Sequence, residues 1–120
     1  MAKIFLDTNI YIDIIKKRTD RDLEDFQGHD LFISPLSIHI LAYLFKYKIP
    51  NHELDVNREL FNIVPFAAKI VEDALIGPTS DFEDNVQLHS AAEADCDVFL
   101  TEDKKLLSMK FFGKVKIDQS

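Results

Sequence analysis

The first apolar run and the polar residues behind it constrain the fold of this chain more than any other stretch. Residues 4–6 are Ile-Phe-Leu, and they lead directly into Asp7, Thr8 and Asn9. A short apolar run of this kind is typical of a strand buried on both faces in a parallel sheet. An acid at its end then lies at the carboxyl edge of the sheet, where open α/β folds bind ligands. On this stretch alone, capping of the following helix is the stronger interpretation of Asp7.

Short apolar runs alternate with stretches of helical periodicity along the whole chain. The expected strands are residues 3–7, 31–33, 61–64, 98–100 and 115–117. The expected helices are residues 9–17, 20–27, 36–48, 52–60, 66–76, 81–95 and 104–107. This alternation predicts a parallel sheet with helices on both faces. Ser80 and Glu83 form a Ser-x-x-Glu capping box for the helix over 81–95, and the lysine-bearing strand over 115–117 suits a sheet edge.

Composition indicates one globular domain over residues 1–120. The length allows one core, and 47% of the residues are hydrophobic. No apolar stretch approaches the ~20 residues of a membrane span, and no signal-peptide pattern opens the sequence. A single cysteine, Cys96, excludes an internal disulfide and fits a reducing compartment. We therefore expect a cytoplasmic protein with no membrane partner.

The formal net charge of −7 argues against a protein that grips nucleic acid through a broad basic surface. It does not exclude an enzyme that acts on nucleic acid, because bound divalent cations would offset clustered carboxylates.

Acids from three separate segments are expected at one edge of the sheet. The helix of a strand–helix–strand unit runs antiparallel to its strands, so its first turn lies at the carboxyl edge. Asp7 ends the first strand, and Asp103 follows the strand over 98–100. The acids in the first turn of the helix between them are Asp81, Glu83 and Asp84. Helix capping explains Asp81 and Glu83 well, and it explains Asp103 about as well as a functional role does.

Carboxylates that crowd together repel one another, and some would be protonated near neutral pH. A divalent cation removes this conflict, and oxygen ligands without His or Cys pairs favour Mg²⁺ or Mn²⁺. Such a cation polarises a phosphate and activates a bound water, so the pattern predicts phosphodiester hydrolysis. His39, on a polar helical stripe, is a weaker hypothesis for a general base.

Three short acidic motifs follow one another along the chain: FLDTN at 5–9, DFED at 81–84 and FLTED at 99–103. Taken in this order, they resemble the acidic motifs of PIN-domain ribonucleases, and the match looks like the VapC-type toxins of prokaryotic toxin–antitoxin modules. The resemblance implies a three-layer, Rossmann-like α/β domain with a central parallel sheet of four to five strands flanked by helices. It also implies an endoribonuclease that depends on Mg²⁺ or Mn²⁺.

The resemblance assigns roles to single residues and implies partners. Asp7, Asp84 and Asp103 would be catalytic metal ligands. The residues that would orient them or hold a metal-bound water are Thr8, Asn9 and Thr101. RNA is the implied substrate, homodimers are common in the family, and a small antitoxin would silence a toxin by placing its tail in the acidic groove.

One acid of the family pattern has no counterpart in this chain. PIN nucleases usually carry a further acid, often Glu, in the helix after the second strand, but residues 31–51 contain neither Asp nor Glu, and Ile40 stands beside the expected position. The loss predicts a weaker metal site, for which Asp81, Glu83 or Glu102 are candidates to compensate. The alternative function is a catalytically degenerate PIN fold that binds RNA or protein.

A third hypothesis is a phosphatase of the haloacid-dehalogenase type, because Asp7-Thr8-Asn9 loosely echoes the Asp-x-Asp of that family. The second acid is replaced by Asn9 and the late paired acids are absent, so this interpretation would need a phosphoaspartate on Asp7 to support it.

Overall fold

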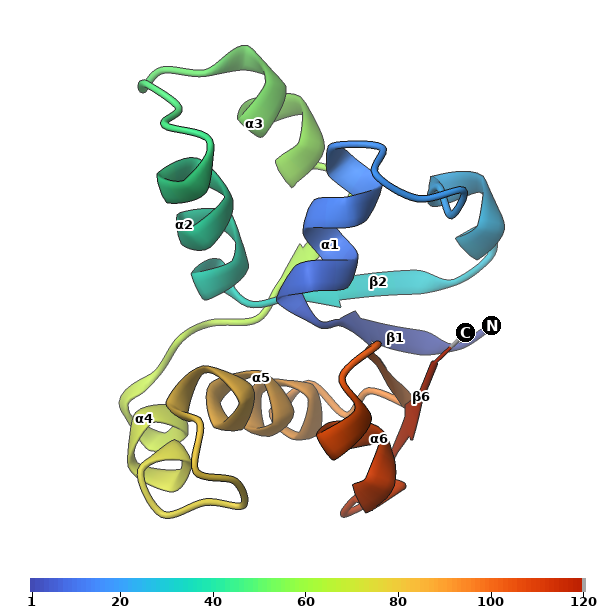
Figure 1. The fold of residues 1–120 in the computed structure, drawn as a ribbon, viewed down its shortest axis with the longest axis vertical. Helices are drawn as coiled ribbons and strands as arrows, with labels where there is room; N and C mark the ends of the chain where they lie inside the picture. The colour runs from blue at the N-terminus through green and yellow to red at the C-terminus, as the bar shows by residue number, and fades with distance from the viewer. Residues whose placement is uncertain (120) are drawn as a thin grey trace.

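A six-stranded sheet forms the centre of the computed structural model, which describes residues 1–119 (Figure 1). Its strand order is β3-β2-β1-β4-β6-β5. The strands are β1 (Lys3–Leu6), β2 (Asp30–Ile33), β3 (Asn62–Ile63), β4 (Val98–Leu100), β5 (Phe111–Phe112) and β6 (Val115–Asp118). All neighbours pair in parallel except β5 and β6, which are antiparallel. The predicted α/β fold with four to five parallel strands is therefore confirmed, and β5 is an addition.

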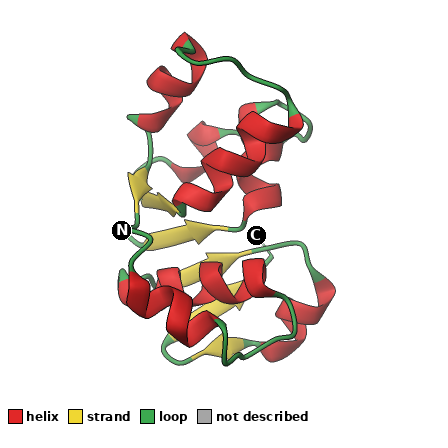
Figure 2. Ribbon diagram, turned by 90° about the vertical axis from the view of Figure 1, so that its left-hand side faces the viewer, coloured by secondary structure: helices red, strands yellow, loops and turns green. Residues whose placement is uncertain are grey.

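Helices cover both faces of this sheet, as Figures 1 and 2 show. They are α1 (Thr8–Ile15), the 3₁₀ helix η1 (Leu23–Phe26), α2 (Pro35–Leu44), α3 (His52–Arg58), α4 (Ala68–Ala74), α5 (Phe82–Glu93) and α6 (Lys104–Met109). The helices α1 to α3 lie on one side and α4 to α6 on the other. None of the helices in residues 1–119 is long and apolar enough to cross a membrane.

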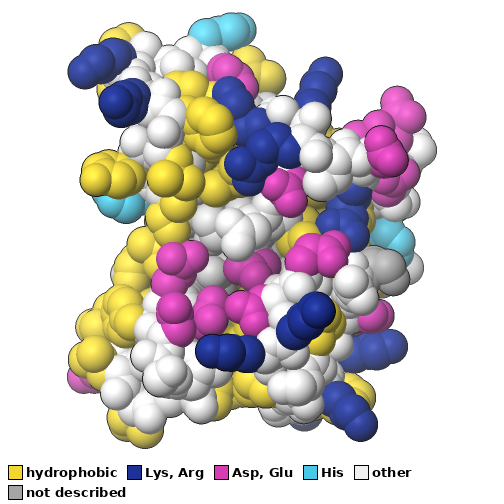
Figure 3. Space-filling model, viewed as in Figure 1, with side chains coloured by type: hydrophobic (Ala, Val, Ile, Leu, Met, Phe, Trp, Pro, Cys, Tyr) yellow, Lys and Arg dark blue, Asp and Glu magenta, His cyan; other side chains and the backbone are white. Residues whose placement is uncertain are grey.

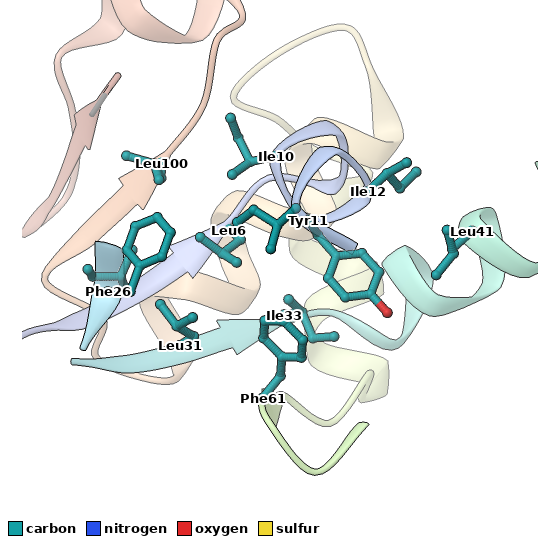
Figure 4. Close-up of a cluster of buried hydrophobic side chains, with 12 residues drawn as sticks. Leu6, Ile10, Tyr11, Ile12, Phe26, Leu31, Ile33, Leu41, Phe61 and Leu100 are labelled. Atoms are coloured by element: carbon teal, nitrogen blue, oxygen red, sulfur yellow. The ribbon is translucent and has the colours of Figure 1, made fainter. Parts of the chain in front are cut away.

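The alternation of side chains along β1 divides the core into two clusters. Ile4 and Leu6 belong to the cluster beneath α1 and α2 (Figure 4), whereas Phe5 belongs to the cluster beneath α4, α5 and α6. Phe5 is stacked on Phe99 of the neighbouring strand, with ring centroids 5.5 Å apart. Because β1 is buried on both faces, its carboxyl end is held rigidly between the two layers of helices.

Two sequence predictions about local structure are wrong. The N-cap of α5 is Asp81, whose Oδ1 accepts a hydrogen bond from the Asp84 backbone N–H at 3.0 Å, so Ser80 and Glu83 do not form the predicted capping box. Asp caps a helix as well as Ser does, and here the helix starts one residue later. The strand over 115–117 is not at the sheet edge, because β5 pairs along the outer side of β6.

Two elements are shorter than predicted. The helix expected over 36–48 ends at Leu44, and Lys46 has a positive φ of 54° that the helix cannot continue through. The strand expected over 61–64 is reduced to two paired residues, Asn62 and Ile63.

Candidate active site

The register of two parallel strands places Asp7 beside Thr101. Leu6 of β1 pairs with Leu100 of β4, so the residues that follow them leave the sheet side by side. The Asp7 backbone N–H donates to the Leu100 carbonyl oxygen at 3.0 Å. The Thr101 hydroxyl donates to Asp7 Oδ2 at 2.6 Å. This short, charge-assisted hydrogen bond fixes one carboxylate oxygen at the carboxyl edge of the sheet.

Asp7 occupies the N-cap position of α1, but its side chain makes no capping hydrogen bond. Asp7 is only 6% exposed, and its carboxylate accepts from Thr101 instead. The capping interpretation of Asp7 is therefore wrong. Burial raises the pKa of Asp7 and the charge of Asp103 raises it further, whereas the hydrogen bond from Thr101 and the nearby polar groups of the Thr8 backbone and Gln87 oppose the rise.

Asp103 combines a capping role with proximity to Asp7. Its Oδ1 accepts hydrogen bonds from the backbone N–H groups of Lys105 at 2.8 Å and Leu106 at 3.3 Å, which start α6. The Asp103 backbone N–H donates to the Thr101 hydroxyl oxygen at 3.0 Å. Thr101 thus connects Asp7 to the loop that carries Asp103.

The first turn of α5 brings further carboxylates to the same edge. Asp84 is half-buried, and its pKa is raised to about 7 by burial first and then by the charges of Asp81, Asp7, Asp103 and Glu83. The pKa of Glu83 is raised by burial and by the charges of Asp7 and Asp81. Figure 3 shows acidic side chains gathered on this face, between the two layers of helices. Acids from three segments are therefore close enough at this edge to shift one another's pKa values.

Three other candidates from the sequence have different surroundings. His39 is exposed on α2, where its ring is stacked on Tyr43 with centroids 6.4 Å apart. Glu102 is an exposed partner of Arg21, at 3.1 Å, and of the Gln119 side chain, at 3.0 Å. The hydrogen bond from Gln119 is the main cause of its lowered pKa, and Arg21 adds to it. Asn9 is exposed on the first turn of α1.

Two buried polar residues next to this site were missed from the sequence. Gln87 of α5 accepts a hydrogen bond from the Thr8 backbone N–H at 2.8 Å, and the Ser37 hydroxyl of α2 lies 2.8 Å from the Thr8 hydroxyl. Gln87 follows Asp84 by three residues, so both lie on the same face of a helix, and that spacing is a signal that could have found it. The helix α2 therefore contributes a hydroxyl, not an acid, and Ile40 packs against the core.

The side chains at this site offer the kind of oxygen ligands that a hard divalent cation prefers. These ligands are carboxylate oxygens. Burial, and after it the repulsion between these acids, raises the pKa values of Asp84 and Glu83, and a cation would relieve that repulsion. Within residues 1–119, no group of three or more His, Cys, Asp or Glu side chains is already arranged to hold a metal ion.

Comparisons with known proteins agree with this fold. A family model described as PIN domain matches residues 3–105. The structure is similar to a chain in the crystal structure of VapBC2 from Rickettsia felis bound to a DNA fragment from their promoter. The TM-score is 0.71 at 16% sequence identity, over 98% of each chain. No curated protein matches the sequence. Because the family model covers most of its length, the chain belongs to the PIN-domain family of nucleases.

Proposed function

We propose that this protein is a metal-dependent endoribonuclease and the toxin of a type II toxin–antitoxin module. The observation that carries the proposal is the group of mutually repelling acids at the carboxyl ends of β1 and β4, in a chain of the PIN-domain family. A carboxyl group whose pKa is raised to about 7, among other acids, is typical of a functional site.

In this proposal Asp7, Asp84 and Asp103 hold Mg²⁺ or Mn²⁺. Asp7 is fixed by Thr101, whereas Asp103 keeps one oxygen on the α6 backbone and presents the other. Asp81 stays at the N-cap of α5 and acts through its charge. When bound, the cation polarises the phosphodiester and lowers the pKa of a bound water. Mg²⁺ usually keeps several waters, which suits carboxylates that are not preassembled as a closed ligand set.

In this proposal, binding of the RNA substrate depends on lysines next to the acids. Lys104 and Lys105 follow Asp103 directly and are exposed on α6. They would hold backbone phosphates of RNA beside the metal site, and Thr8 and Asn9 would line the same edge. In a chain with a net charge of −7, such local cations support binding without a broad basic surface.

The direct test is RNA cleavage by the purified protein with Mn²⁺ or Mg²⁺ and with EDTA. We expect cleavage that EDTA abolishes and that the Asp7→Asn and Asp84→Asn proteins lack. Glu72→Gln, an exposed acid on α4, is the matched control and should cleave like the wild type. Cleavage in EDTA, or full activity of both Asn variants, would contradict the metal mechanism.

The alternative, a degenerate PIN fold that only binds, is favoured by one observation: α2 brings Ser37 rather than an acid to the site. Calorimetric titration with Mn²⁺ separates the two functions. Absence of binding at millimolar Mn²⁺, with an intact fold by circular dichroism, would support the binding module.

We also propose an antitoxin and a second copy of the chain as partners. The likeness in fold to a chain of VapBC2 supports a protein partner, and apolar side chains are exposed on and after α2, including Tyr43, Leu44 and Ile49. Light scattering coupled to gel filtration tests the homodimer. A monomer at micromolar concentrations would contradict that part of the proposal.

A further inference from the structure

We infer that Gln87 is a positioning residue for Asp7: its buried amide accepts a hydrogen bond from the Thr8 backbone and directs its own N–H donors toward the Asp7 carboxylate. The inference rests on the proposed function, since it concerns how one proposed metal ligand is held.

Gln87 is fully buried on α5, in the helix that also carries the buried apolar residues Val86 and Leu88. A buried amide is costly unless its polar atoms are paired. Its Oε1 accepts a hydrogen bond from the Thr8 N–H at 2.8 Å. Thr8 is the first residue of α1, and the first N–H groups of a helix have no partner inside it. Gln87 therefore supplies the cap that the Asp7 side chain does not.

This hydrogen bond also fixes the orientation of the amide. A backbone N–H can pair only with the oxygen of a glutamine side chain, so Oε1 must face Thr8 and Nε2 must face away from it. Nε2 is buried and makes no hydrogen bond within the part of the chain that the structure describes. Buried hydrogen-bond donors are normally paired, so a buried donor without a partner, next to acids, indicates an acceptor close by.

Asp7 is the acceptor that best fits this donor. It directly precedes Thr8, and its Oδ2 is held by Thr101 on β4. A carboxylate can accept about four hydrogen bonds, so it has room for a donor from α5. Two elements, β4 and α5, would then fix the orientation of one carboxylate.

Residues that orient a metal ligand typically affect metal affinity or activity about 10- to 100-fold when they are replaced. Gln87→Met removes both amide interactions and keeps the length and shape of the side chain. Gln87→Glu keeps an acceptor for Thr8 but replaces the donor with a second carboxylate oxygen. Ser90→Ala, which changes another buried polar residue on α5, is the matched control, because its hydroxyl bonds only to the Val86 carbonyl among the described contacts.

The first arm uses metal-free, ¹⁵N-labelled protein and requires no activity. We expect the Gln87 side-chain amide protons to exchange slowly with solvent and their NMR signals to shift in Asp7→Asn but not in Ser90→Ala. Signals that do not respond to Asp7→Asn would overturn the inference. This arm decides the role of Gln87 even if the wild-type protein binds no metal, an outcome that would instead contradict the proposed function.

The second arm measures Mn²⁺ affinity by calorimetry and the kinetics of RNA cleavage. We expect Gln87→Met to bind Mn²⁺ about tenfold more weakly than the wild type and Ser90→Ala to match it. We expect both Gln87→Met and Gln87→Glu to lower kcat while KM for RNA is unchanged. Because Gln87→Glu keeps the Thr8 contact, wild-type kcat in that variant would show that Gln87 only caps α1, and the positioning role would be wrong.

Discussion

At the scale of single residues, Asp84 is the acid of the site whose pKa the fold raises to near neutrality. Burial and four nearby acids raise its pKa to about 7, and the pKa values of Asp7 and Glu83 shift in the same direction. A raised pKa means that the folded protein holds protons which the unfolded chain, where Asp has its ordinary pKa of 3.8, has already released. Folding stability therefore decreases as pH rises between these two values.

We predict that the melting temperature of the metal-free protein falls as pH is raised from about 4 to about 7, the interval between the unfolded and folded pKa values of Asp84. Asp84→Asn should flatten this dependence, and Glu72→Gln should leave it unchanged. Thermal melts in EDTA at several pH values measure it. A wild-type melting temperature that rises across the same interval would contradict the electrostatic description of the site.

Deprotonation of Asp84 should also make cation binding pH-dependent, because a carboxyl group must lose its proton to become a ligand. We predict that Mn²⁺ binds more tightly at pH 8 than at pH 6, with proton release on binding. Calorimetry in buffers of different ionisation enthalpy measures both quantities. Identical affinity at the two pH values would remove Asp84 from the ligand set.

Thr101 connects the two loops that carry Asp7 and Asp103. We predict that Thr101→Val lowers the free energy of unfolding by about 1–3 kcal/mol, because it leaves a buried carboxylate without its donor. Thr101→Ser keeps the hydroxyl and should lose much less. Urea denaturation of both variants gives the difference, and equal losses would contradict the prediction, because they would show that the methyl group matters as much as the hydrogen bonds.

At the scale of elements, the parallel pairing of β1 with β4 positions the site. Phe5 and Phe99 are fully buried and stacked on each other in the cluster beneath α4 to α6. We predict that Phe5→Ala costs about 3–5 kcal/mol of stability, the usual range for removal of a buried aromatic side chain. Phe111→Ala, at a position 58% exposed on β5, is the matched control and should cost far less. Chemical denaturation measures both.

Most helices and strands could be located from the sequence, because their apolar runs and their caps are local signals. Asn51, for example, directly precedes α3 and caps it, with its Oδ1 accepting from the Leu54 N–H at 3.0 Å. The strand β5 is absent from the sequence prediction because its two residues are too few to show a periodic pattern. The Gly113-Lys114 turn between β5 and β6, with Gly113 at a φ of 60°, is the signal that a hairpin prediction could have used.

At the scale of the whole molecule, the proposed function depends on cations beside the site and not on the net charge of −7. In the proposed function, Lys104 and Lys105 begin α6 next to the acids, whereas Lys114 lies in the β5–β6 turn, at the opposite edge of the sheet. Variants of Lys104 and Lys105 can therefore be compared with a variant of Lys114 as the control.

We predict that Lys104→Gln and Lys105→Gln each weaken RNA binding and lower the salt dependence of log K by about 0.7 per lost phosphate contact. Lys114→Gln should leave both unchanged. Fluorescence anisotropy with a single-stranded RNA and the Asp84→Asn protein, over a range of KCl concentrations, measures this without cleavage. Binding that does not change with salt would remove these lysines from the proposed substrate path.

The sequence by itself determined the alternation of strands and helices, the placement of acids at strand ends and helix starts, and the absence of an acid from residues 31–51. These features follow from local patterns of residues, which do not depend on how distant parts of the chain pack. Only the tertiary structure decided that Asp7 turns to Thr101 instead of capping α1, that Glu102 is paired with Arg21, and that Gln87 is buried against Thr8. Each of these contacts joins residues about 80 or more positions apart, and which partner a polar group finds at that separation depends on how the strands and helices pack.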